Sequence, residues 1–346
     1  MSFKITIQPS GHVFEMEANE KILDAALHHG FAFPYGCRDG ACTTCAGKVL
    51  AGKVAYPDEW PLGLSEEDHE KGLALFCQAR PLSDLEIEVK EIGAAKDIAV
   101  KTLPTRIIKM EKLAPDVMML HLKLPASERL QFLAGQYIDI LLKDGRARSF
   151  SLANSPGHDE FLELHIREVP GGDFTERVFH GIKEKDLLRI KGPLGSFFLR
   201  DDSERPIIMM AGGTGFAPAK GMIEQAIEMG LQQPITLYWG VRATADLYQR
   251  ELVEKWAQEH EHIHFIPVLS EPDEVDNWQG RTGFVHDAVA DDFKDLSAHD
   301  VYMCGPPPMI EAAKKAFALR GVDQEHLFYD SFEFSTDTLK AISGRT

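Results

Sequence analysis

The residues best suited to chemistry are four cysteines, three of which lie within nine positions. Cys37, Cys42 and Cys45 have the spacing C-x4-C-x2-C, and Cys77 follows after a further 31 residues. This spacing is typical of plant-type ligation of a [2Fe–2S] cluster, in which four thiolates hold two irons. Small residues such as Gly36 let the backbone wrap closely around such a group. The pattern therefore predicts a protein that handles single electrons through these four metal ligands.

Three other interpretations of these cysteines are weaker. A zinc site usually has two C-x2-C units, whereas only Cys42 and Cys45 form one here. A disulfide framework suits a small secreted domain, but this chain has 346 residues, and its first residues alternate like a strand instead of forming a signal peptide. Buried structural cysteines would not cluster in this way. The fifth cysteine, Cys304, lies 227 residues beyond Cys77 and belongs to another feature.

The composition is that of a globular protein, with 44% hydrophobic and 26% charged residues. A formal net charge of −17 argues against a nucleic-acid partner, because the phosphates would be repelled. No uncharged apolar run is long enough for a transmembrane helix, so no membrane partner is expected. Cysteine thiolates reserved for iron fit a reducing compartment, and we therefore predict a cytoplasmic protein.

A chain of this length is expected to form two or three domains, and changes in pattern locate them. The N-terminal part contains short alternating strands and one helical stretch. The middle part has strands at near-regular spacing, typical of an antiparallel barrel. The last part repeats strand, glycine-rich turn and helix, which indicates a doubly wound parallel sheet. The predicted ranges are 1–93 for the first domain, 94–102 for a linker, 103–201 for the barrel and 202–346 for the doubly wound domain.

Individual elements follow from the same patterns. In the first domain we predict a helix at 21–29 and strands at 2–8, 12–17, 47–50 and 85–89. In the rest of the chain we predict a helix at 219–229 and strands at 118–124, 137–142, 161–167, 207–211, 235–239, 264–268 and 300–304.

Two motifs of the last domain suit a dinucleotide. Gly212-Gly213-Thr214-Gly215 lies where a strand leads into a helix, so backbone amides and the helix dipole can hold a pyrophosphate. It is not the full G-x-G-x-x-G fingerprint, and a tight turn without a ligand is the alternative. Cys304-Gly305-Pro306 ends a later strand, where α/β sheets bind their ligands. Cys304 could lie beside a nicotinamide ring, although by itself it is better explained as a small buried apolar residue.

A third motif, Arg148-Ser149-Phe150-Ser151, follows a predicted strand and turn of the barrel. The fork of donors on an arginine suits a phosphate, and the two hydroxyls could hydrogen-bond a polar ring edge. Taken alone, an ordinary barrel strand is the simpler explanation.

The order of these features is more specific than any one of them. An iron–sulfur loop followed by Arg-Ser-Phe-Ser, Gly-Gly-Thr-Gly and Cys-Gly-Pro-Pro resembles the ferredoxin–NADP-reductase-like family. Within that family it is similar to the three-domain iron–sulfur flavoprotein reductases that serve bacterial oxygenases and the CDP-6-deoxyhexose dehydrase pathway. The resemblance covers nearly the whole chain. It implies a ferredoxin-like β-grasp domain, an antiparallel β-barrel that binds FAD and a doubly wound sheet that binds NAD(P).

The resemblance also implies roles for single residues. Arg148 would pair with the FAD pyrophosphate and Ser151 would face flavin N5, while Phe150 replaces a family tyrosine and loses its hydroxyl. Phe332 would cover the isoalloxazine, with Tyr329 as the second choice. The implied catalytic residues are Ser151, Cys304 and Phe332. The implied cofactor-binding residues are Arg148, Ser149, Phe150, Ser151, Gly171, Gly172, Thr175, Gly212, Gly213, Thr214, Gly215, Cys304, Gly305, Pro306 and Phe332.

The implied reaction carries electrons from NADH to FAD, then to the [2Fe–2S] cluster, and then to an external acceptor protein. NADH is preferred to NADPH because the segment 239–248, which follows the second strand of the last domain, has a single arginine, Arg242, with Asp246 nearby. The acceptor is a CDP-6-deoxyhexose dehydrase or an oxygenase or hydroxylase component, and the ending Asp330-Ser331-Phe332 favours the dehydrase. The alternative is a non-catalytic iron–sulfur redox sensor with a vestigial dinucleotide site, against which the intact motifs argue.

Overall fold

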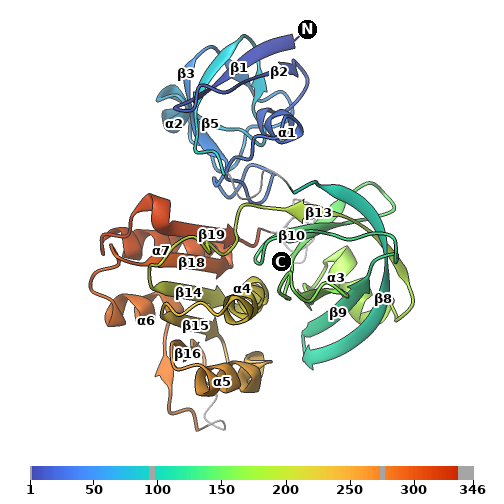
Figure 1. Ribbon diagram of the computed structural model, residues 1–346, viewed down its shortest axis with the longest axis vertical. Coiled ribbons are helices and arrows are strands. Elements are labelled where there is room, and N and C mark those ends of the chain that lie inside the picture. The colour runs from blue at the N-terminus through green and yellow to red at the C-terminus, as the bar shows by residue number, and fades with distance from the viewer. Residues whose placement is uncertain (1, 93–97, 273–276, 334–346) are drawn as a thin grey trace. The chain divides into compact units, whose positions relative to one another are not determined.

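The computed structural model describes residues 2–92, 98–272 and 277–333 (Figure 1). The chain forms two compact units, one of Met1–Ala99 with Gly195–Phe197 and one of Val100–Leu194 with Phe198–Thr346. Within the three described segments, no helix has both the length and the apolar character needed to cross a membrane.

The first unit is built on a five-stranded mixed sheet with the order β2-β1-β7-β3-β5. Strands β1 and β2, both predicted, pair antiparallel as a hairpin, and β1 also pairs with β7 in parallel. Its elements are β1 (Ser2–Gln8), β2 (Val13–Glu17), α1 (Ile22–His28), β3 (Ala46–Ala51), β4 (Val54–Ala55), α2 (Glu66–Glu70), β5 (Leu73–Leu75), β6 (Arg80–Pro81) and β7 (Leu85–Glu88).

Helix α1 connects the sheet of the first unit to the segment that carries Cys77. Most of its apolar positions, Ile22 and Leu23 among them, are buried, which explains the helical spacing in the sequence. No side chain caps its N-terminus. Instead, the amides of Ile22 and Leu23 donate to the carbonyls of Ala79 and Phe76, at 3.0 and 2.9 Å. The orphan donors of the first turn therefore hold the chain on both sides of Cys77.

The second unit begins with a six-stranded antiparallel sheet of order β11-β10-β13-β8-β9-β12. A bridge between Leu152 and Leu164 links its two edge strands, so the sheet closes on itself as a barrel. Alternate residues point into one apolar core that includes Ile138, Leu164 and Phe174. Its elements are β8 (Lys101–Ala114), β9 (Val117–Lys123), β10 (Tyr137–Leu141), β11 (Ala147–Ser151), β12 (Leu162–Arg167), α3 (Asp173–His180) and β13 (Leu187–Leu194).

The second unit continues with a six-stranded parallel sheet of order β17-β16-β15-β14-β18-β19. Helices α6 and α7 pack together on one face, and α4 and α5 lie on the other (Figure 1). The elements are β14 (Ile207–Gly212), η1 (Gly213–Gly215), α4 (Phe216–Met229), β15 (Ile235–Val241), η2 (Thr244–Asp246), α5 (Arg250–Glu259), β16 (Ile263–Leu269), β17 (Arg281–Thr282), α6 (Val285–Asp292), β18 (Asp300–Gly305), α7 (Pro307–Ala318), η4 (Gln324–His326) and β19 (Leu327–Ser331).

The strand order of this parallel sheet creates a switch point. Strand β14 is the first strand of this sheet along the chain. Strands β15 and β16 are added on one side of it, and β18 and β19 are added later on the other side. Loops therefore diverge at the carboxyl ends of β14 and β18, which is where open α/β sheets bind ligands. Those two ends carry the glycine motif and the Cys304-Gly305-Pro306 motif.

The structure differs from the sequence-based expectation at several elements, among them β5, β13 and α2, for which no range was predicted. Strand β8 begins at Lys101, inside the range 94–102 predicted as a linker, and residues 94–97 of that range lie outside the described residues. Helix α4 begins at Phe216 instead of Ala219, because Pro218 falls in the first turn, where the missing amide costs no hydrogen bond. Helix α3 was not anticipated, since its eight residues include only three apolar ones.

Candidate functional site

The four predicted cluster ligands lie together as two pairs. In the first pair, each backbone amide of Cys37 and Cys42 donates to the other residue's Sγ at 3.3 Å. Hydrogen bonding with Cys37 lowers the pKa of the Cys42 thiol to about 6 and raises that of Cys37. In the second pair, a hydrogen bond with Cys45 raises the pKa of the Cys77 thiol. The first pair thus favours a thiolate at Cys42.

This paired arrangement suits a two-iron cluster, in which each iron takes two thiolates. Over the described segments, no group of three or more His, Cys, Asp or Glu side chains surrounds one point, as a single bound ion requires. The Thr44 hydroxyl is buried beside Cys42, and its hydrogen bonding to that sulfur helps to lower the pKa of the Cys42 thiol. Such a donor suits an anionic sulfur of the cluster. The residues present therefore fit a [2Fe–2S] group, which supplies one-electron chemistry when bound.

Glycine is required in the cysteine loop for two reasons at Gly40. Its φ of +87° is one that other residues rarely adopt, and a Cβ there would lie 2.9 Å from Pro61 Cβ. Gly63 closes the same contact by donating its amide to the Gly40 carbonyl at 2.9 Å. The segment around Pro61 thus packs directly on the loop and fixes its path.

The Arg-Ser-Phe-Ser motif forms most of strand β11, where the side chains alternate in direction. Ser149 is exposed and its hydroxyl donates to Asp139 Oδ1 on the neighbouring strand at 2.7 Å. Phe150 packs at a tilt on Phe174, with ring centroids 5.6 Å apart. The Arg148 guanidinium, which is partly exposed, donates to the adjacent Ala147 carbonyl at 2.8 Å. This strand thus presents a cation, an aromatic ring and two hydroxyls, a set that fits a flavin nucleotide.

The loop with Gly171 and Gly172 is closed by its own groups. The Gly171 amide donates to Glu176 Oε1 at 2.6 Å, and the Gly172 amide donates to the Val169 carbonyl at 2.8 Å. The Thr175 hydroxyl accepts from the Val169 amide at 3.1 Å. A pyrophosphate would have to displace Glu176 to reach the Gly171 amide. The predicted role of this loop in holding the pyrophosphate stays a prediction.

The buried hydroxyl of the flavin strand meets the parallel sheet. Ser151 Oγ donates to Asp330 Oδ2 at 3.4 Å, although the two residues are 179 positions apart. Asp330 lies on β19, directly beside Cys304 on β18 in the strand register. Burial first, and then the charge of Asp330, raises the pKa of the Cys304 thiol well above its usual value. Three strands thus bring together Ser151, Cys304 and the Asp330 carboxylate, to which the sequence analysis gave no role in the cofactor site.

The two dinucleotide motifs also touch each other. Cys304 Sγ donates to the Gly215 carbonyl at 2.8 Å. A Cβ on Gly215 would lie only 2.1 Å from the Cys304 carbonyl oxygen, so the two backbones are as close as glycine allows. The amide of Phe332 donates to the Gly305 carbonyl at 2.9 Å, which places that aromatic residue at the same strand ends. The structure therefore gathers the predicted nicotinamide motif, glycine motif and closing phenylalanine in one place.

Comparisons with known proteins follow the same three-part order. Residues 5–82 match the 2Fe-2S iron-sulfur cluster binding domain family, residues 104–199 the oxidoreductase FAD-binding domain family, and residues 209–315 the oxidoreductase NAD-binding domain family. The CDP-6-deoxy-L-threo-D-glycero-4-hexulose-3-dehydrase reductase of Yersinia pestis is 40% identical over 96% of this chain and 99% of its own length.

The chain belongs to the three-domain iron–sulfur flavoprotein reductases. The phenol 2-monooxygenase reductase component DmpP of Pseudomonas sp. CF600 is a further relative, 36% identical over 97% of this chain and 96% of its own. The solved structure of the Amycolatopsis cytochrome P450 reductase GcoB shares 34% identity and superposes with a TM-score of 0.80, covering 95% of this chain and 98% of that one.

Family membership confirms the predicted fold class and cofactors. The reductase is an NAD(P)H-dependent iron–sulfur flavoprotein oxidoreductase with a [2Fe–2S] domain, an FAD-binding barrel and an NAD-binding parallel sheet. FAD supplies two-electron hydride chemistry when bound, and the four thiolates, the β11 motif and the two strand-end motifs are the features of this chain that suit its cofactors.

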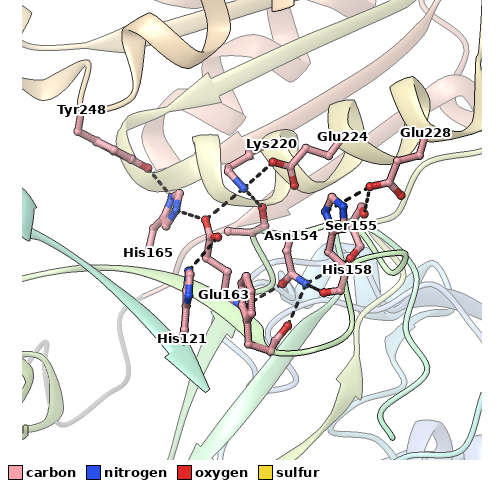
Figure 2. A network of polar contacts seen from close by, with 12 residues as sticks. His121, Asn154, Ser155, His158, Glu163, His165, Lys220, Glu224, Glu228 and Tyr248 are labelled. Atoms are coloured by element: carbon pink, nitrogen blue, oxygen red, sulfur yellow. Dashed lines mark hydrogen bonds and ion pairs between the residues drawn. The ribbon is translucent and has the colours of Figure 1, made fainter. Parts of the chain in front are cut away.

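The sequence analysis missed a buried polar network in the second unit of the reductase (Figure 2). Glu163 and His165 on β12 meet Lys220 on α4, and all three are buried. Lys220 was detectable in principle, since it is a lone charge in the apolar run that follows the glycine motif. Glu163 and His165 occupy a strand whose residues are nearly all buried, a feature that the alternation of the sequence does not indicate.

Proposed function

We propose that the reductase takes a hydride from NADH where the flavin strand and the nicotinamide motif converge, and passes single electrons through its cysteine loop to a separate acceptor protein. The contact of Ser151 with Asp330, beside Cys304 and Gly215, carries this proposal. It brings a flavin-type motif and a nicotinamide-type motif to the same strand ends. We retain the domain ranges 1–93, 103–201 and 202–346, and the proposed catalytic residues are Ser151, Cys304 and Phe332.

The chain's own groups prepare this site in three ways. The Ser151 hydroxyl holds its proton toward Asp330, so it is oriented along a defined axis. The Cys304 thiol stays protonated, because burial raises its pKa, and it therefore presents a neutral side chain to the nicotinamide position. Phe332 is anchored through its amide to Gly305, which leaves its ring available to cover a flat cofactor.

The preference for NADH is supported by the partners of Arg242. Its Nε lies 3.2 Å from Asp246 Oδ2, and its Nη2 lies 3.7 Å from Asp116 Oδ2. A 2′-phosphate at this arginine would compete with two carboxylates, whereas a ribose hydroxyl would not. This argument favours NADH as the donor and leaves Arg242 compensated by acidic groups.

The acceptor we favour is a CDP-6-deoxyhexose dehydrase. Support comes from the Yersinia pestis dehydrase reductase, which matches the reductase from end to end, while the monooxygenase reductase component is somewhat less similar. We also propose a cytoplasmic location, because thiolates that hold iron must stay reduced.

A direct assay separates the candidate functions. The purified reductase is mixed anaerobically with NADH, and flavin and cluster absorption are followed before and after adding a dehydrase or an oxygenase component. Bleaching of both chromophores followed by faster reoxidation with the dehydrase supports the proposal. Faster reoxidation with the oxygenase component alone would select the other acceptor. A cluster that absorbs but never responds to NADH would instead support the non-catalytic sensor.

A further inference from the structure

Helix α4 carries a buried lysine that no cofactor motif includes. Lys220 is 5% exposed, and its Nζ donates to the Ala153 carbonyl at 3.0 Å. The same ammonium lies 2.7 Å from Glu224 Oε1 and 3.2 Å from Glu163 Oε1 (Figure 2). Burying such a charge costs several kcal/mol per ion, and a well-packed apolar side chain often serves stability equally well. Stability alone is therefore a poor explanation of this lysine.

Its position joins the two halves of the proposed hydride-transfer site. Ala153 follows Ser151 by two residues on the flavin side, and Lys220 follows Gly215 by five residues on the dinucleotide side. The next residue, Gly221, packs so closely that its Cβ would lie 2.9 Å from the Asn154 carbonyl oxygen. One turn of helix α4 thus rests with its backbone directly on the segment that leaves the flavin strand.

Glu163, whose carboxylate pairs with Lys220, makes several other hydrogen bonds. The Glu163 amide donates to Asn154 Oδ1 at 2.9 Å, and the Ala153 amide donates to the Glu163 carbonyl at 2.8 Å. Its carboxylate oxygens lie 3.2 Å from His121 Nε2 and 2.9 Å from His165 Nε2. The ion pair with Lys220 therefore has a fixed acceptor, and it does not depend on a mobile side chain.

A second series of contacts, through aromatic side chains, links His165 to the glycine motif. His165 Nδ1 lies 3.1 Å from the Tyr248 hydroxyl, and the Tyr248 ring packs edge-on against Trp239 with centroids 5.1 Å apart. Trp239 stacks on Phe216 at 4.0 Å, and its Nε1 donates to the Gly213 carbonyl at 2.9 Å. The glycine motif is thus tied to β12 both through helix α4 and through these rings.

We propose that Lys220, paired with Glu163, is a positioning residue that sets the distance between the flavin and the nicotinamide for hydride transfer. It touches neither group and acts through helix α4, whose first residue follows the glycine motif. The inference rests on the proposed function. Without the lysine, the glycine motif keeps its own contacts with Cys304 and Trp239, so dinucleotide binding persists while alignment with the flavin is lost.

The test compares Lys220→Met with wild type as the FAD- and cluster-loaded holoenzyme. We expect flavin reduction at saturating NADH to slow about 10- to 100-fold, because misplacement by about 1 Å can cost 10²-fold. The Kd for NAD⁺, measured by calorimetry, should change less than about threefold. Amide hydrogen exchange should rise in residues 152–154 and in the first turns of α4. The matched control, Lys255→Met, removes an exposed lysine of the same domain whose Nζ is 3.8 Å from Glu259, and it should leave all three measurements unchanged.

A double variant keeps the test decisive if Lys220→Met is unstable. Lys220→Met removes the cation from two carboxylates, Glu163 and Glu224, and adding Glu163→Gln neutralises the more deeply buried one, so thermal stability should recover in part. The rate should stay low, because the link to Ala153 is still missing. Recovery of the rate together with stability, or a wild-type rate in Lys220→Met, would overturn the positioning role. If the wild-type holoenzyme itself fails to oxidise NADH, the proposed function fails instead, and the two failures are distinguishable.

Discussion

The closest approach between the two dinucleotide motifs gives the sharpest prediction, which concerns Gly215→Ala. The added Cβ would lie 2.1 Å from the Cys304 carbonyl oxygen and 2.7 Å from its carbonyl carbon. Real Cβ atoms essentially never come closer than 3.0 Å, so the two backbones must separate by about 0.9 Å, the difference between 2.1 and 3.0 Å. Both obstructing atoms belong to the backbone of β18, so no side-chain rotation relieves the clash. The φ of Gly215, −57°, is ordinary, so the prediction rests on the steric clash alone.

The expected consequence is a loss of rate larger than the loss of stability. Overpacking of this kind costs about 1–3 kcal/mol of folding free energy. Separating the glycine motif from the nicotinamide motif by almost 1 Å should slow hydride transfer by about 10²-fold. The thiol of Cys304 also loses its 2.8 Å hydrogen bond to the Gly215 carbonyl, which loosens the same contact.

Anaerobic stopped-flow measurement of flavin reduction by NADH tests this directly. Cluster absorption and reduction by dithionite should be normal, since neither uses the dinucleotide motifs. Gly181→Ala is the matched control, because its nearest contact would be an ordinary 3.5 Å to the Arg177 carbonyl. The control should reduce its flavin within about twofold of wild type. A folded Gly215→Ala protein that matched the wild-type rate would refute the steric reasoning.

Three further predictions follow from the structure. Cys42→Ser should leave flavin reduction by NADH within about twofold of wild type but abolish reduction of the acceptor, as stopped-flow and acceptor assays would show; loss of both in an FAD-loaded protein would contradict the proposed order of transfer. Asp246→Asn frees Arg242 from its nearest carboxylate and should shift the ratio of NADPH to NADH kcat/KM upward by about tenfold, because a charge-assisted hydrogen bond contributes about 1.5–3 kcal/mol; an unchanged ratio would place the 2′-position elsewhere. Burial lowers the pKa of His165 from its usual 6.5. The contribution of neutral His165 to the free energy of unfolding is therefore complete above about pH 6.5. It declines as the pH falls toward the folded-state pKa, by at most about 1.4 kcal/mol per pH unit for one proton. Urea unfolding between pH 5 and 8 should show this slope, and His165→Gln should flatten it. The titratable groups that face His165 are Glu163, Lys220, His121 and Tyr248. An equal slope in both proteins would assign the titration to another residue.

Local sequence features determined the parts of the reductase whose geometry depends on neighbours along the chain. The spacing of Cys37, Cys42 and Cys45 is itself the shape of a short loop, so it predicted the cluster ligands. Apolar periods of two and 3.6 residues predicted most strands and helices, because each element buries one face. The order of the motifs along the chain indicated the family of the reductase, because that order can be read without knowing where the motifs lie in space. Helix α4 started earlier than predicted because a proline in a first turn resembles a helix breaker in sequence.

Only the tertiary structure decided which distant groups meet. Ser151 contacts Asp330 because the barrel closes through Leu152 and because β19 lies outside β18, and no local pattern encodes either event. Lys220 and Glu163 are both charges in apolar surroundings, and each alone would be read as a misplaced surface residue. Their pairing, like the 2.1 Å constraint at Gly215, results from backbones forced together by burial of the sheet and barrel cores. The sequence identified the cofactors, and the packing of strands from distant parts of the chain positioned the residues that serve them.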